Sequence, residues 1–123
     1  MSAVDLELVT RFLQALEAAA KTGDRDPVYP FLADDVEWVT PKRTLSGIEE
    51  VRQELTWVTP PENLDVEFEQ GQTEDLGDGQ IALDVHQIYR MKGTGDFAYA
   101  RDRRLDLIVR EGRIARYEMR IIG

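Results

Sequence analysis

Apolar residues recur about every four positions over the first twenty residues of the chain. The stripe consists of Val4, Leu8, Phe12, Leu16 and Ala20. A repeat of three to four residues places apolar side chains on one face of an α-helix. The pattern therefore predicts an amphipathic helix that ends near Gly23, because glycine readily adopts the left-handed conformation that closes a helix.

Two shorter helices are predicted after this one from their start signals. The aspartate and proline that open segment 26–32 are typical of a helix N-cap and first helical position. Ser46 and Glu49 have the spacing of a capping box, in which a hydroxyl and a carboxylate each accept a backbone N–H. The third helix should then run to Trp57, because the prolines that follow cannot continue a helix.

The rest of the chain alternates between apolar and polar side chains with the two-residue period of β-strands. The predicted strands are 35–40, 64–74, 79–91, 97–110 and 113–122. Turns that contain glycine separate the last four of them. Helices followed by long antiparallel strands indicate one α+β domain over residues 1–123, with the helices covering one face of the sheet.

The alternation divides the strand residues between two faces of the sheet. The inward face is mainly apolar, and its polar and aromatic members are Trp38, Thr40, Phe68, Gln70, Gln87, Tyr89, Phe97, Tyr99, Arg101, Arg103 and Tyr117. The outward face carries Asp84, His86, Arg90, Asp102, Arg104, Asp106, Arg116, Glu118 and Arg120. Interleaved charges on neighbouring strands fit either a solvated surface or a two-fold contact with a second copy of the chain, and we predict a homodimer through this face.

Composition and charge exclude several classes of function. The chain has 24 acidic and 15 basic residues, a net charge of −9, which disfavours nucleic acid and anionic membranes as partners. It has no cysteine and one histidine, so no cofactor or metal site is expected. The N-terminus lacks the order of a signal peptide, and no apolar run approaches the ~18 residues of a membrane span. These features predict a cytoplasmic protein.

Three segments carry distinctive local patterns, namely 31–38 (FLADDVEW), 46–52 (SGIEEVR) and 109–117 (VREGRIARY). They resemble motifs of the nuclear transport factor 2-like superfamily and of its SnoaL-like members, which include relatives of ketosteroid isomerase and limonene epoxide hydrolase. The resemblance covers nearly the whole chain. It implies a cone-shaped, cystatin-like fold, in which three N-terminal helices pack on the concave face of a curved antiparallel sheet.

The catalytic residues of those enzymes do not carry over to this sequence. In ketosteroid isomerase an Asp base works opposite an oxyanion hole made of a Tyr and a protonated Asp. The positions that match these three by resemblance are Thr40, Leu16 and Leu105. The Asp-Arg-Asp set of limonene epoxide hydrolase falls near Val85, Gln87 and Met119. The resemblance therefore implies the fold without implying either reaction.

Arg103 is the most informative inward residue. An arginine on an apolar face is costly to bury unless an acceptor meets its guanidinium. Glu17, Glu54 and a bound ligand all remain open as that acceptor, and arginine suits carboxylate ligands through its bidentate geometry. We predict a pocket for a largely apolar ligand that can carry a carboxylate. Its predicted lining is Leu16, Trp38, Thr40, Trp57, Val85, Gln87, Tyr99, Arg103, Leu105, Tyr117 and Met119.

Two other functions remain open from the sequence. The first is an enzyme of the same superfamily, of the isomerase, cyclase, dehydratase or epoxide hydrolase type, that uses Thr40, Gln87, Arg103 and tyrosines in an atypical site. The second is a structural or protein-interaction module whose cone is filled by its own side chains. A pocket of about 300 Å³ or more would indicate a small-molecule binding protein or an enzyme, and its absence would indicate this module.

Overall fold

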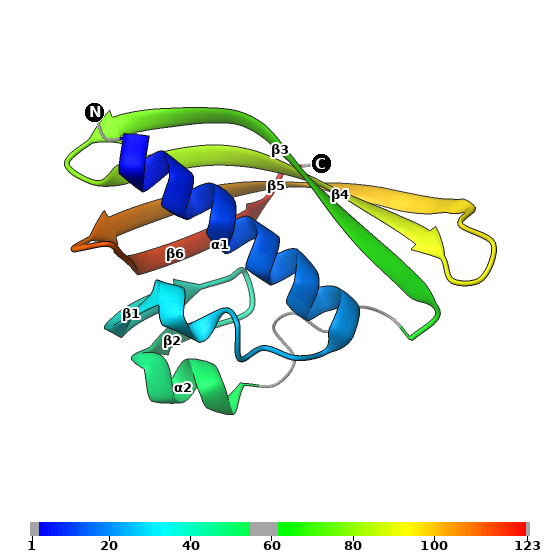
Figure 1. Cartoon of the computed structure of the whole chain (residues 1–123), viewed down its shortest axis with the longest axis horizontal. Coiled ribbons are helices and arrows are strands. Elements are labelled where there is room, and N and C mark those ends of the chain that lie inside the picture. Colours follow the sequence, from blue (N-terminus) through cyan, green and yellow to red (C-terminus); the bar gives the residue numbers. More distant parts are fainter. Residues whose placement is uncertain (1–2, 55–61, 123) are drawn as a thin grey trace.

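One long helix lies across a curved six-stranded sheet in the computed structural model, which describes residues 3–54 and 62–122 (Figure 1). The elements are α1 (Ala3–Thr22), the 3₁₀ turn η1 (Tyr29–Phe31), β1 (Leu32–Val39), β2 (Thr44–Ser46), α2 (Ile48–Gln53), β3 (Leu64–Gly77), β4 (Gln80–Met91), β5 (Phe97–Arg110) and β6 (Arg113–Ile121). The strand order is β2-β1-β6-β5-β4-β3. β1 and β6 run parallel, so the sheet is mixed and the prediction of a purely antiparallel sheet is wrong. Parallel neighbours need a long connection, which α2 and strands β2–β5 supply here.

The first predicted helix is confirmed as α1. Gly23 follows it with φ of +81°, and its N–H donates to the carbonyl of Ala19 at 2.8 Å. The helix buries Phe12 and Leu16, as the apolar stripe predicts. Val4, in the first turn, is 73% exposed, so the buried stripe begins later than its sequence pattern.

Two α-helices form in the described part of the chain, so the prediction of three is wrong. Segment 26–32 contains a turn and the short 3₁₀ element η1, and Leu32 already begins β1. The helix start signal is present, but Pro30 has no N–H to bond to the carbonyl four residues earlier. An α-helix therefore cannot extend past its first turn in this segment.

The third predicted helix corresponds to α2, with a different start. Ser46 is the last residue of β2, and Gly47 occupies the N-cap position. The N–H of Ser46 donates to the carboxylate of Glu50 at 2.6 Å, so Glu50 takes the place that the capping box predicted for Glu49. The predicted helix end at Trp57 lies outside the described residues.

The strand pattern is confirmed for most of β3 to β6, but register shifts change its phase in places. One shift puts Phe97, which the alternation placed inward, in register with the outward residue Arg90. The pairing of β5 with β6 shifts register between Ile108 and Val109. Because a bulge turns the following side chains over, Ile114 is fully buried, whereas the alternation placed Ala115 inward. Tyr117 returns to the predicted inward phase.

Ion pairs link neighbouring strands on the outward face, as its mixed charges predict. His86 contacts Asp102 across β4 and β5 at 2.6 Å, and Arg104 contacts Asp84 at 3.5 Å. Arg120 pairs with the carboxylate of Asp106. The inward face, by contrast, packs against α1 through apolar side chains.

Candidate functional site

Arg103 lies half-buried on the inward face of β5, in register with Val85 of β4. Its Nε donates to the side-chain oxygen of Gln87 at 3.1 Å. Its Nη1 is buried and has no hydrogen-bond partner among the described residues. A buried donor without an acceptor costs about 1–3 kcal/mol. A ligand that supplied an acceptor to Nη1 would therefore bind favourably.

Neither carboxylate that the sequence offered as a partner for Arg103 is in contact with it. Glu17 accepts the backbone N–H of Phe68 at 2.6 Å, and Glu54 pairs with Arg43. No carboxylate in ranges 3–54 and 62–122 forms an ion pair with Arg103. The remaining positions of the chain contain no Asp or Glu. The guanidinium therefore has a neutral amide oxygen as its side-chain acceptor and no acidic side chain.

Two tyrosines near Arg103 stay protonated at neutral pH. Burial raises the pKa of Tyr89, and the nearby positive charge of Arg103 lowers it in part. Burial raises the pKa of Tyr117 strongly, with the charge of Arg103 acting in the opposite direction. Both hydroxyls can therefore donate hydrogen bonds, and the inward polar groups around Arg103 form a donor-rich surface that suits an anion.

Stacked aromatic rings close the narrow end of this inward surface. Trp38 stacks on Tyr117 with ring centroids 3.8 Å apart and planes 14° apart, and Phe12 lies edge-on to both rings. Trp38 is 2% exposed, so its ring is part of the core. Along the inward side of β5, Leu107 and Leu105 are buried, Arg103 is half-buried and Arg101 is exposed. Arg103 lies between the closed and the open end.

The predicted pocket residues fall into three groups. The closed core contains Leu16, Trp38, Val85 and Leu105. The inward surface around Arg103 and the edge of the core contain Gln87, Tyr99, Arg103, Tyr117 and Met119. Thr40 lies apart in the turn between β1 and β2, where its hydroxyl donates to the carbonyl of Arg43 at 3.3 Å. Trp57 lies outside the described residues.

The predicted pocket set omits two residues that the structure places beside Arg103 and Gln87. Tyr89 lies next to Arg103 and stacks on Tyr99 with centroids 4.5 Å apart. Phe68 is half-buried and in register with Gln87. The strand alternation placed both on the inward face, and cross-strand register, which requires the fold, is the signal that brings them to the site.

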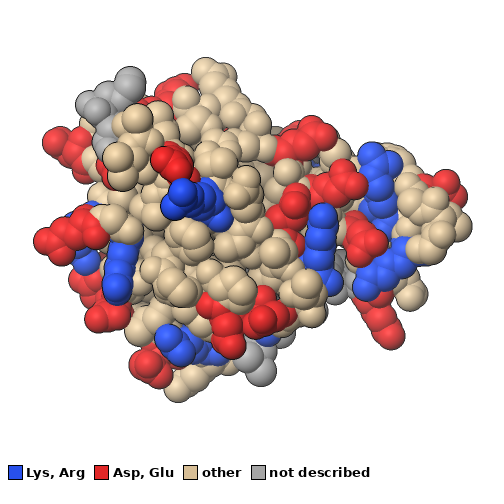
Figure 2. Space-filling model, in the orientation of Figure 1, with Lys and Arg blue, Asp and Glu red and all other residues tan. Residues whose placement is uncertain are grey.

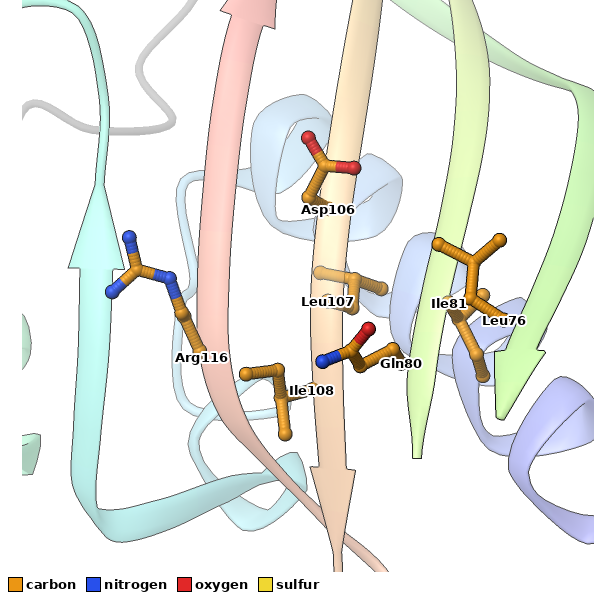
Figure 3. Close-up of a pocket in the computed structure, with 7 residues that line it drawn as sticks. All are labelled: Leu76, Gln80, Ile81, Asp106, Leu107, Ile108 and Arg116. Atoms are coloured by element: carbon orange, nitrogen blue, oxygen red, sulfur yellow. The ribbon is translucent and has the colours of Figure 1, made fainter. Parts of the chain in front are cut away.

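Among the hollows of the described surface, three lie away from Arg103. The outward face has one of about 170 Å³, where Figure 3 shows Asp106, Ile108 and Arg116 on strands β5 and β6. A hollow of about 260 Å³ lies between α1 and β3. An open one of about 490 Å³ lies beside η1 and α2, where Arg52 covers the ring of Tyr29. The two smaller hollows are below the ~300 Å³ typical of ligand sites, and the largest is open and lined by charges of both signs.

Comparisons with known proteins give a fold but no closer relative. No family model matches the chain, and no curated protein matches it. Among solved structures it is similar to an NTF2-like protein of Anabaena variabilis, with TM-score 0.75, 13% identity and coverage of 100% of this chain and 93% of that one. It is also similar to an NTF2-like protein of unknown function from Burkholderia pseudomallei, with TM-score 0.74, 19% identity and coverage of 99% and 92%.

A third similar structure is that of TerC co-crystallised with polyporic acid, with TM-score 0.69, 19% identity and coverage of 98% of this chain and 92% of that one. Several of the similar solved structures are NTF2-like proteins, and one is a protein with a cystatin-like fold. The chain therefore has the NTF2-like fold that the sequence motifs predicted. No helix in the described ranges is both long and apolar enough to cross a membrane.

Proposed function

We propose that this protein binds a small, largely apolar anion, and that Arg103 holds the anionic group. The buried Nη1 of Arg103, which lacks an acceptor among the described residues, carries the proposal. A carboxylate is the acceptor that matches a guanidinium best, because both are planar and form two parallel hydrogen bonds. Phe68, Tyr89 and Met119 offer half-buried apolar surface for the rest of the ligand.

The chemistry of the inward groups supports binding rather than acid–base catalysis. Gln87, Tyr89 and Tyr117 are neutral at pH 7, and Arg103 is a permanent cation. None of these four groups accepts a proton near neutral pH, as a general base must. The similarity to a protein co-crystallised with polyporic acid supports an acidic ligand for a chain of this fold.

A matched pair of compounds tests the proposal. 2-Naphthoate and its neutral isostere 2-naphthamide differ in charge at one group, and thermal unfolding of the whole chain is measured with each. A ligand at 100 times its dissociation constant adds about 2.7 kcal/mol to stability, which raises the midpoint by about 10 °C for a domain of this size. We expect a clear shift with the carboxylate and a much smaller shift with the amide.

Two variants make the test specific to the site. Arg103→Met should abolish the difference between the two compounds. Arg104→Met removes the same charge from the outward face of the same strand and should preserve it. Equal shifts with both compounds in the wild type, or a carboxylate preference that survives Arg103→Met, would contradict the proposal.

We also propose that the outward face binds a second copy of the chain. Arg104 lies directly opposite Arg120, and Asp106 lies directly opposite Glu118. Like charges in such pairs are unfavourable within one sheet. A two-fold axis between these two pairs would place the arginine pair of each copy on the acidic pair of the other copy. Such an arrangement fits a self-complementary contact. Sedimentation velocity tests this: we expect a dimer that Arg120→Glu weakens, and a monomeric wild type would contradict it.

A further inference from the structure

Arg101 is a second inward arginine of β5, two residues nearer the hairpin than Arg103. It is exposed, it lies in register with Gln87, and its Cζ is 4.7 Å from the centroid of the Tyr99 ring. Its Nη1 donates to the carbonyl of Ala100 at 3.1 Å. Within the described ranges it forms no ion pair with a carboxylate. The contact with the ring and the hydrogen bond hold the guanidinium at the open end of the inward surface.

The charge around Arg101 is unusual for this chain. The protein carries a net charge of −9 and therefore repels small anions as a whole. The inward positions of the arm formed by residues 64–70, 85–91 and 97–103 contain no Asp or Glu, and two of them are Arg101 and Arg103. In Figure 2 the arm extends to the right of the molecule, where basic side chains gather among acidic ones. The inward side chains of the arm are thus positive, and the acidic side chains of the same arm lie in its outward phase.

We infer that Arg101 captures the anionic ligand from solvent and that Arg103 retains it. This inference rests on the proposed function. An exposed charge acts over distance and mainly changes the rate of association, whereas a desolvated charge in direct contact mainly changes the rate of dissociation. The two arginines occupy these two environments on one strand face. The ligand would meet Arg101 first and move inward to the free donor of Arg103.

The size of the effect follows from the spacing along the strand. Residues two apart are about 7 Å apart, and two unit charges at this separation in water interact by about one RT. Removing Arg101 should therefore slow association about threefold at low salt. The screening length is about 30 Å at 0.01 M salt and about 3 Å at 1 M, so the effect should vanish at 1 M.

Stopped-flow fluorescence with 1-anilinonaphthalene-8-sulfonate measures both rates on the whole chain. Arg101→Ala should slow association about threefold at 0.01 M salt, match the wild type at 1 M, and leave dissociation unchanged. The uncharged analogue N-phenyl-1-naphthylamine should associate equally fast with both proteins. Arg113→Ala is the matched control, because it removes the same charge about 30 Å away along the sheet.

Three results would overturn the inference. The first is that Arg101→Ala and the wild type associate with the probe at equal rates at 0.01 M salt. The second is that Arg113→Ala slows association as much as Arg101→Ala does. The third is that Arg101→Ala changes only the dissociation rate. Failure of the proposed function gives a different result. In that case Arg103→Met would leave the dissociation rate and affinity of the sulfonate unchanged, whatever Arg101→Ala does.

Discussion

Replacing Arg103 with methionine distinguishes a ligand-binding arginine from a structural one. Methionine retains an unbranched apolar stem and removes the guanidinium. Two contributions to the free energy of unfolding then oppose each other. The hydrogen bond to Gln87 is lost, at about 1.5–3 kcal/mol for a bond to a charged group. The buried, unsatisfied donor at Nη1 is removed, which returns about 1–3 kcal/mol.

The net change in stability should therefore be within about 1.5 kcal/mol. An arginine that is half of a buried ion pair behaves differently, because removing one partner leaves an uncompensated charge and costs about 3–5 kcal/mol. The described residues contain no carboxylate paired with Arg103, which is the reason for expecting the smaller value. Binding should change far more than stability, since the carboxylate preference depends on this guanidinium.

Urea unfolding followed by intrinsic tryptophan fluorescence measures the change. With a slope of about 1.5 kcal/mol per molar urea, Arg103→Met should move the midpoint by about 1 M or less. Arg104→Met, on the outward face, should have a similarly small effect, because its ion pair with Asp84 is only half-buried and remains accessible to water. A fall of 2 M or more for Arg103→Met alone would refute the reasoning and assign Arg103 to a structural ion pair.

Three further predictions concern the framework around the site. Trp38→Ala should cost about 3–5 kcal/mol in urea unfolding, because it empties a fully packed position; a cost below 1 kcal/mol would contradict the closed core. Burial keeps the Tyr117 hydroxyl protonated to a higher pH in the folded protein than in the unfolded one. Above pH 10 the wild type should therefore lose about 1.4 kcal/mol of stability per pH unit from this group. Tyr117→Phe should remove that part of the loss. Equal pH slopes for variant and wild type would refute this. Gly77→Ala should cost about 1–2 kcal/mol of stability, because Gly77 has φ of +87° but free space for a Cβ. Gly79→Ala should cost more, because Gly79 has φ of +78° and a Cβ there would clash with the Val109 carbonyl. Equal losses of stability for the two variants would contradict the close approach of Gly79 to Val109.

Much of the fold follows from local sequence patterns. The two-residue alternation predicts the buried inward side chains of β4 and β5, because one face of each strand packs on the core. It does not predict Ala82 and Ile88, which are buried in the outward phase of β4. The four-residue stripe predicts α1 for the same reason. The 26–32 segment shows where local signals compete, since a good helix start is followed by Pro30. The phase change at Ile114 depends on a backbone bulge, for which the alternation carries no signal.

The site is only partly predictable from the sequence. Alternation alone places Arg103 and Gln87 on the inward face, and their hydrogen bond confirms that placement. The absence of an acidic partner depends on the position of α1 across the sheet. There Glu17 accepts the N–H of Phe68 on the edge strand β3. Sequence spacing cannot establish that contact, because it joins residues 51 positions apart.

A crystal structure of the protein with 2-naphthoate tests the central claim most directly. We predict that a carboxylate oxygen lies about 2.7–2.9 Å from Nη1 of Arg103, the length of a charge-assisted hydrogen bond. The naphthalene ring should lie on the inward surface beside Tyr89 and Met119. The account would be contradicted if naphthoate bound elsewhere on the protein. It would also be contradicted if another group of the protein accepted the hydrogen bond of Nη1 and no naphthoate were bound there.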